Sequence, residues 1–245
     1  MTSFADRILP NWKQSLEGVL EKARALGPKA LLAFDLDSTL FDNRPRQARI
    51  LREFGQARGI PELTSCGPEH FTSGWDLRGP MKVLGLSEER IDALYPDLKA
   101  FWQERFFTSP YCLDDVAIEG AAAFVQAAVR TGARVCYVTG RHEGMREGTE
   151  GALKKDGFPL PGGNVELIMK PTLEVSDDDF KREAHARLHR MGQVIAAFDN
   201  EPMHANDYRR NFPEAQVIHL ATDHSGRPVE LLEGIVSVPN FQLSA

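Results

Sequence analysis

Short apolar runs, most of them followed directly by polar residues, alternate along the chain with segments of helical periodicity. The runs cover residues 30–34, 133–138, 165–169, 194–198 and 216–220. Strands that helices cover on both faces are typically continuous apolar runs of this length. Strands that alternate with helices build βαβ units and a parallel sheet. We therefore predict an α/β fold whose core is a Rossmann-like, doubly wound parallel sheet.

Helical spacing of apolar residues fills the stretches between most of these runs. The first helix is predicted over residues 11–26, after Pro10 and before Gly27-Pro28, because proline favours a helix start and glycine a helix end. Further helices are predicted over residues 116–131, 142–155, 177–190 and 202–211.

A long segment, residues 43–112, separates the first apolar run from the second. It is too long for a loop in a compact domain, and it contains helical stretches near residues 45–58 and 87–106. We predict that residues 43–112 form an inserted, mostly helical module. Residues 1–42 and 113–245 then form the α/β core.

Two groups of side chains in this module invite a functional interpretation. The first is the basic stretch of Arg44, Arg46, Arg49 and Arg52, which can attract an anion but which we expect to lie mostly on a solvated helix face. The second is Trp75, Phe101 and Trp102. We expect these rings to pack in the core of the module rather than to form a stacking platform for a base.

Two carboxylates follow the first apolar run, in the stretch Ala33-Phe34-Asp35-Leu36-Asp37-Ser38-Thr39. Ligands of open α/β sheets bind just outside the carboxyl ends of the strands. Alternate residues of a strand point the same way, so Asp35 and Asp37 are expected to face one crevice. Two like charges so close together are costly unless a cation or a proton lies between them.

The ends of the later runs also carry polar groups. Thr139-Gly140-Arg141 follows the second run, where a hydroxyl and a neighbouring backbone N–H can hold a phosphoryl oxygen. Asp199 follows the fourth run. Two lysines compete for the role of a nearby cation: Lys170 at the end of the third run, and Lys181 near the start of the next helix.

Taken in order, Asp35-x-Asp37-x-Thr39, Thr139, a lysine and Asp199 resemble the four motifs of the haloacid dehalogenase (HAD) superfamily. The resemblance implies a hydrolase in which residues 43–112 are a C1 cap, Asp35 is the nucleophile and Asp37 is the general acid/base. It also implies catalytic roles for Thr139 and Lys181. Asp35, Thr139, Gly140 and Lys181 would bind the phosphate. We prefer Lys181 to Lys170 because the family's lysine commonly opens the helix before the fourth motif.

The resemblance further implies a magnesium site formed by Asp35, Asp37 and Asp199. These are hard oxygen donors, and Mg²⁺ typically takes one or two carboxylates and keeps several waters. The commoner family pattern places a second acid next to Asp199 or a few residues later, but here Asn200 is adjacent and His204 and Asn206 occupy the later positions. The second outer ligand therefore stays open between Asn200, Glu201 and neither.

The presence of both acids in the first motif favours phosphoryl transfer, because the dehalogenases of the family lack the second one. The implied function is a Mg²⁺-dependent phosphatase that acts through an aspartyl-phosphate on Asp35, with a small phosphorylated metabolite as substrate. A phosphomutase or phosphotransferase and a polynucleotide-end phosphatase stay open as alternatives. A non-catalytic binding protein on the same fold is a more distant one.

The composition of the chain narrows the classes of binding partner that we expect. The chain has 42% hydrophobic and 26% charged residues, as globular proteins do, and a net charge of −6. That charge counts against nucleic acid and against an anionic membrane surface. No apolar run approaches the ~20 residues that cross a bilayer. Cys66, Cys112 and Cys136 lack metal-site spacing and suit a reducing cytoplasm, where we expect the protein. The sequence leaves the oligomeric state open.

Overall fold

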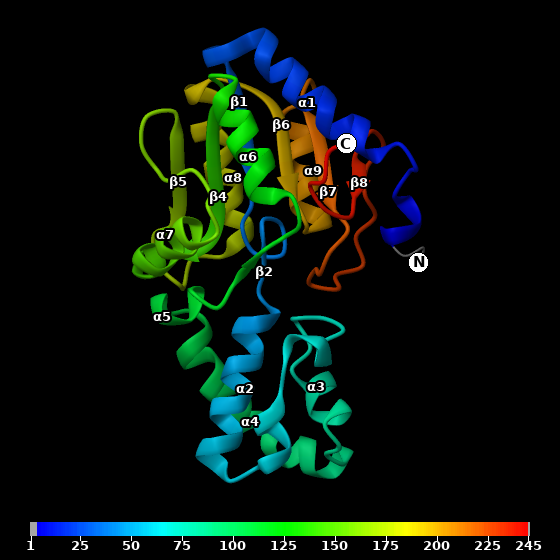
Figure 1. The fold of residues 1–245 in the computed structure, drawn as a ribbon, viewed down its shortest axis with the longest axis vertical. Helices are drawn as coiled ribbons and strands as arrows, with labels where there is room; N and C mark the ends of the chain where they lie inside the picture. The colour runs from blue at the N-terminus through cyan, green and yellow to red at the C-terminus, as the bar shows by residue number, and fades with distance from the viewer. Residues whose placement is uncertain (1–3, 245) are drawn as a thin grey trace.

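Six parallel strands form the central sheet in the computed structural model, which describes residues 4–244 (Figure 1). Their order across the sheet is β5-β4-β1-β6-β7-β8. The strands are β1 (Ala30–Phe34), β4 (Arg134–His142), β5 (Val165–Lys170), β6 (Gln193–Asp199), β7 (Gln216–Leu220) and β8 (Val236–Val238). The chain builds outward from β1 in both directions, so the end of β1 is where the strand order reverses. Such reversal points are where ligands of open α/β sheets bind.

Helices cover both faces of the sheet. Helices α1 (Trp12–Leu26), α6 (Ala121–Arg130) and α7 (Arg146–Lys155) pack against one face, where Leu32 and Phe34 of β1 point. Helices α8 (Asp177–Met191) and α9 (Pro202–Asn211) pack against the other, where Leu31 and Ala33 point. Alternate side chains of β1 thus face opposite layers of helices, which explains why all five of its residues are apolar and buried. None of the helices within residues 4–244 is both long and apolar enough to span a bilayer.

The inserted segment forms a helical module below the sheet in Figure 1. Its helices are α2 (Arg44–Arg58), α3 (Arg78–Val83) and α4 (Glu88–Phe106), and they enclose a separate apolar cluster that includes Leu51, Phe54 and Leu98. Helix α5 (Ser109–Cys112) leads back to the sheet domain, and Cys112 already packs in the apolar cluster of that domain. We call the module the cap.

The chain enters and leaves the cap through a short antiparallel ribbon. Strand β2 (Phe41–Asp42) pairs with β3 (Val116–Ala117). The predicted helix over residues 116–131 was therefore wrong at its start. Gly120, with a φ of 78°, separates β3 from α6, and this left-handed conformation favours glycine.

Two further boundaries differ from the prediction. Strand β4 continues past Val138 through the polar residues to His142, with a register shift against β5 between Thr139 and His142. A 3-10 turn over Glu143–Met145 then precedes α7, so the regular helix starts four residues later than predicted. Strand β8 was not predicted, because its three residues are too few to show a pattern.

Candidate active site

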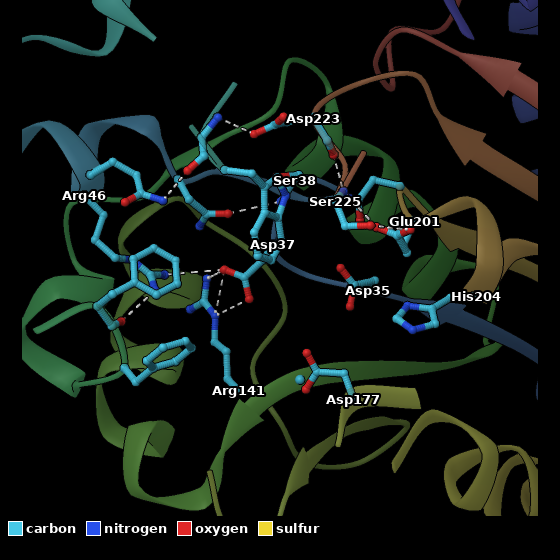
Figure 2. Close-up of a pocket in the computed structure, with 18 of the residues that line it drawn as sticks. Asp35, Asp37, Ser38, Arg46, Arg141, Asp177, Glu201, His204, Asp223 and Ser225 are labelled. Atoms are coloured by element: carbon cyan, nitrogen blue, oxygen red, sulfur yellow. Dashed lines mark hydrogen bonds and ion pairs between the residues drawn. The ribbon is translucent and has the colours of Figure 1, made fainter. Parts of the chain in front are cut away.

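A cavity of about 410 Å³ lies between the carboxyl ends of the central strands and the cap. Asp35, Gly140 and Asp199 line it from the sheet domain, and Trp102 and Phe106 line it from the cap. Figure 2 shows side chains from both parts of the chain converging on this cavity. The position agrees with the crevice that the order of strands predicts.

Asp35, Lys181 and Asp199 meet at the floor of the cavity. The backbone N–H of Asp35 donates to the carbonyl of Phe198 at 2.9 Å, which aligns the ends of β1 and β6. The Lys181 ammonium donates to Asp35 Oδ1 at 2.6 Å, to Asp199 Oδ2 at 3.0 Å and to the carbonyl of Val138 at 2.8 Å. The structure thus connects four elements, β1, β4, β6 and α8, through one buried cation.

The three ionisable groups at this floor shift one another's pKa values. Burial raises the pKa of Asp35 to about 7, and the neighbouring carboxylates Asp199 and Asp37 add to that effect against the attraction of Lys181. The pKa of Lys181 is raised, because Asp199 and Asp35 outweigh its burial. Lys181 also lowers the pKa of Asp199, against the effect of burial. One ammonium therefore serves two carboxylates, and a further cation would favour the ionised form of Asp35.

Asp37 has a different environment, formed by two arginines. Arg141 binds both of its oxygens, with Nε 2.9 Å from Oδ2 and Nη2 2.8 Å from Oδ1, and Arg46 Nη2 lies 3.5 Å from Oδ1 (Figure 2). Asp115 is fully buried and accepts from Arg46 Nε at 2.8 Å and from Arg141 Nη2 at 2.7 Å. We call Asp37, Asp115, Arg46 and Arg141 the arginine–aspartate quartet. Burial alone would raise the pKa of Asp37, but Arg141 and Arg46 hold it at about 2.

The predicted phosphate-binding residues of β4, Thr139 and Gly140, lie at different depths. Thr139 is fully buried, and its Oγ1 accepts from the backbone N–H of Arg141 at 3.2 Å. Gly140 lines the cavity, and a side chain there would collide with Asp177. Lys170 donates to Asp177 Oδ1 at 2.8 Å. Of the two lysine candidates, only Lys181 therefore reaches Asp35.

The residues that follow Asp199 are held by the loop after β7. Asn200 Oδ1 accepts from Thr39 Oγ1 at 3.0 Å, and Asn200 Nδ2 donates to the carbonyl of Asp223 at 2.6 Å. Glu201 accepts from the backbone N–H and the hydroxyl of Ser225, at 3.0 and 2.9 Å (Figure 2). Both candidates for a second outer metal ligand already have partners in this arrangement.

His204 adds a second positive group beside Asp199. Its Nδ1 lies 3.7 Å from Asp199 Oδ1, and its Nε2 lies 3.1 Å from Asp178 Oδ1. Burial would lower the pKa of His204, but the interaction with Asp199 outweighs burial and raises it to about 9. Asp199 is therefore flanked by two cationic side chains, Lys181 and His204.

Magnesium was predicted to bind Asp35, Asp37 and Asp199. Within residues 4–244 no group of three or more His, Cys, Asp or Glu side chains is placed to hold a metal ion. The carboxylate of Asp37 is taken by the arginines, so the structure does not bring the three together as a cluster. Asp35 and Asp199 do lie together, and Asp35 Oδ2 has no hydrogen-bond partner among the described residues. Two neighbouring hard oxygen donors, one with a free oxygen, fit Mg²⁺, which keeps most of its waters.

The cap closes over the cavity through the loop after β7. The Asp223 carboxylate accepts from Ser73 Oγ at 2.7 Å and from the backbone N–H of Gly74 (Figure 2). From the cap side, Gln47 Nε2 donates to the carbonyl of Gly74 at 2.7 Å. Because the carbonyl of Asp223 also binds Asn200, this cap contact is connected to the residue next to Asp199.

Several of these residues were missed or misjudged from the sequence. Arg46 was expected on a solvated helix face together with its neighbours, but it is fully buried, so that expectation was wrong for this residue. Nothing in the sequence distinguishes Asp115 or Asp223 from ordinary surface acids. Phe101 packs against Phe54 in the cap core at 5.4 Å, as expected. Trp75 does not, because its side chain is exposed and lines the cavity.

Comparison with known proteins shows which solved structures resemble this fold. No protein-family model matches the chain, and no curated protein matches it in sequence. A putative phosphatase from Clostridium difficile superposes with a TM-score of 0.50 at 10% identity, over 82% of this chain and 88% of that one. Protein Tyrosine Kinase A from Mycobacterium tuberculosis gives a TM-score of 0.50 at 15% identity, over 86% and 93%.

A class C acid phosphatase from Bacillus anthracis, solved with tungstate bound, matches 78% of this chain at 15% identity with a TM-score of 0.43. This chain covers only 60% of that protein. At these identities the likeness concerns the fold alone. The predicted class, a Rossmann-like α/β core with an inserted helical module, is confirmed, and the two proteins that superpose with a TM-score of 0.50 share this fold.

Proposed function

We propose that this protein is a HAD-type phosphatase that hydrolyses the phosphate monoester of a small metabolite, with Mg²⁺, through an aspartyl-phosphate on Asp35. The observation that carries the proposal is the position of Lys181, buried between Asp35 and Asp199 at the point where the strand order reverses. A carboxylate and an ammonium held together at that point suit nucleophilic attack on an anion.

The reaction would begin at the unpaired oxygen of Asp35. Oδ2 attacks phosphorus, the bond from phosphorus to the leaving oxygen breaks, and Lys181 balances the negative charge that gathers on the phosphoryl oxygens. Asp35 and Asp199 would hold Mg²⁺, whose charge screens the repulsion between carboxylate and phosphate. Water then attacks the aspartyl-phosphate and releases inorganic phosphate, which regenerates Asp35.

Asp37 would transfer the protons. While Arg141 and Arg46 hold it, the pKa of Asp37 is about 2, so its carboxylate is ionised but is a weak base for the attacking water. To protonate the leaving oxygen it must first lose part of this stabilisation. A phosphate dianion competes with Asp37 for the forked guanidinium of Arg141. Substrate binding would therefore release Asp37 and raise its pKa toward the value that a general acid needs.

The test is hydrolysis of p-nitrophenyl phosphate with and without Mg²⁺, by the wild type and by Asp35→Asn. We expect Mg²⁺-dependent release of inorganic phosphate that the substitution lowers by at least about 10³-fold. Asp97→Asn, an exposed cap carboxylate paired with Arg58, is the control and should keep wild-type activity. Equal turnover by Asp35→Asn would exclude Asp35 as the nucleophile. Transfer of the phosphoryl group to an added sugar, in place of water, would favour a phosphotransferase.

A further inference from the structure

We propose that the substrate of this site is a phosphate monoester that carries an uncharged planar aromatic ring, and that the ring stacks on Trp75 of the cap. The inference rests on the proposed function, which places the phosphate at Asp35, and it adds the chemical class of the rest of the substrate. Four observations carry it: an unpartnered tryptophan, a fixed aromatic wall, the pairing of the basic side chains that line the cavity, and the size of the cavity.

Trp75 is an exposed aromatic side chain on a fixed backbone. Its exposed fraction is 61%, although it lines the cavity, and its ring stacks on no other ring or cation within the described part of the chain. The backbone just before it is held on both sides, because Gly74 donates to Asp223 and accepts from Gln47. An unpartnered indole on such a loop offers a flat face at little cost in side-chain entropy.

The α4 side of the cavity is also aromatic. Trp102 stacks on Phe106 at 4.7 Å with an interplanar angle of 23°, and Phe107 lies edge-on to Trp102 at 5.5 Å. The indole N–H of Trp102 donates to Gln47, which fixes the ring. All three rings line the cavity. Flat apolar walls of this kind favour a flat apolar group over a sugar, whose hydroxyls need polar partners.

The charges of the cavity argue against a second anionic group on the substrate. Each lysine and arginine that lines it, within residues 4–244, already faces a carboxylate. Three of these pairs are Arg44 with Asp42 at 2.7 Å, Arg227 with Asp178 at 3.1 Å, and Lys170 with Asp177 at 2.8 Å. A second phosphate or a carboxylate would have to break one of these pairs. The amide of Gln103 is exposed at the wall and has no partner among the described residues, so it can bind the polar edge of a ring.

The size of the cavity fits such a substrate. Its volume of about 410 Å³ lies within the range of roughly 300–1,000 Å³ that holds ligands of drug size. The same cavity reaches from Asp35 to Trp75, so one molecule can place its phosphate at the floor and its ring at the cap. A mononucleoside phosphate has this composition: one phosphate, a short linker and an uncharged planar base.

The experiment compares substrates with the same reacting centre. Adenosine 5′-monophosphate and cytidine 5′-monophosphate are measured against ribose 5-phosphate, which has the same phosphate on the same ribose carbon but no base. We expect kcat/KM to be at least about tenfold higher for the two nucleotides, because stacking of a base on an aromatic side chain is worth about this much. Trp75→Ala should lower this ratio about tenfold, and Trp75→Phe should keep most of it.

Val83→Ala is the matched control, because Val83 is a comparably exposed apolar residue of the cap that does not line the cavity. It should leave the ratio unchanged. Equal kcat/KM for all three substrates would overturn the ring site and leave the phosphatase standing. If the wild type hydrolyses none of them, nor p-nitrophenyl phosphate, the proposed function fails. Calorimetric binding then decides the ring site alone: it stands if the nucleotides bind tighter than ribose 5-phosphate and falls if they do not.

Discussion

Asp35 and Asp37 lie two residues apart and have opposite electrostatic environments. Burial raises the pKa of Asp35 to about 7, while Arg141 and Arg46, acting against burial, hold that of Asp37 at about 2. Environments that separate the pKa values of two neighbouring acids commonly separate their chemical roles as well. Here the separation depends on arginines from two different elements, β4 and α2.

The first prediction concerns Arg141, the arginine that binds both oxygens of Asp37. Arg141→Gln removes the guanidinium that orients Asp37 and that we expect to bind the incoming phosphate. We expect kcat/KM for p-nitrophenyl phosphate to fall about 10²-fold, the lower end of the range for loss of general acid–base catalysis. Arg146→Gln, on the exposed face of α7, is the control. Activity of Arg141→Gln within threefold of the wild type would show that Asp37 does not depend on Arg141.

The second prediction concerns His185, on the buried face of α8, whose ring nitrogens have no hydrogen-bond partner among the described residues. Its neighbours are the rings of Tyr208 and Phe212, at 4.5 and 5.4 Å. Burial, helped by the charge of Lys181, lowers the pKa of His185 from 6.5 to about 4. The folded state therefore keeps this ring neutral, and the stability it contributes is complete above pH ~6.5 and is lost as the pH falls toward 4.

His185→Phe should therefore make the free energy of unfolding less dependent on pH between 4.5 and 6.5. Chemical denaturation at several pH values measures this dependence. Some slope should persist, because burial also lowers the pKa of His219 to about 4. His70→Gln, in the cap, is the control. An unchanged slope in His185→Phe would contradict the assignment.

At the scale of the element, helix α8 matters most, because it carries Lys181 near its start. Ser176 caps the helix: its Oγ accepts from the backbone N–H of Asp179 at 3.1 Å. Three acids, Asp177 to Asp179, follow in the first turn, where the helix dipole favours negative charge. A well-formed first turn fixes the direction in which Lys181 points.

The third prediction tests whether the position of Lys181 depends on the N-cap of α8. Ser176→Ala should lower the free energy of unfolding by about 1 kcal/mol, the usual effect of losing an N-cap. It should also lower kcat severalfold, because Lys181 follows directly after the turn that frays. Ser87→Ala is the matched control, since Ser87 caps α4 in the same way at 3.3 Å and has no catalytic residue behind it. If both variants lose equal stability and equal activity, the N-cap residue Ser176 does not influence catalysis through Lys181.

The sequence predicted the central strands and the helices between them well. Apolar runs that end in Asp35, Thr139 and Asp199 located three central strands, because a buried parallel strand needs a continuous apolar run. Lys181 was preferred over Lys170 from its place at a helix start, and the structure brings it to Asp35. The start of the helix over 116–131 was wrong, because Val116 and Ala117 pair with a distant strand that local periodicity does not reveal.

The cavity walls were harder to predict. Arg46 and Asp115 are 69 residues apart in the chain, and each looks like a surface charge until the fold brings them together. Trp75 looks like a core residue because tryptophan usually is one. Its exposure follows from the loop that Asp223 and Gln47 hold, and that loop depends on contacts between the cap and the sheet domain.

At the scale of the whole molecule, two of the contacts between the cap and the sheet domain border the cavity. One is the contact of Asp223 with Ser73 and Gly74 at the mouth of the cavity, and the other is the arginine–aspartate quartet at its base. The first involves backbone and hydroxyl groups of a loop. The second is a set of buried ion pairs.

The fourth prediction concerns the mouth. Asp223→Ala removes the acceptor for Ser73 and Gly74, so the loop that carries Trp75 should lose its fixed position. We expect KM to rise about tenfold, a smaller change in kcat, and faster amide hydrogen exchange at residues 73–75. Glu214→Ala, an exposed acid on the sheet domain, is the control. Unchanged exchange at residues 73–75 would show that Asp223 does not hold the loop.

The buried position of Arg46 also decides how separable the cap is. Arg46 comes from the first turn of α2, yet it binds Asp37 and Asp115 of the sheet domain and is fully buried. Removing one partner of such a buried pair typically costs about 3–5 kcal/mol. A shortened chain that joins residue 42 directly to residue 113 would leave Asp115 with one arginine instead of two. The insertion is thus a continuous segment of the sequence, yet the sheet domain depends on it for part of its stability.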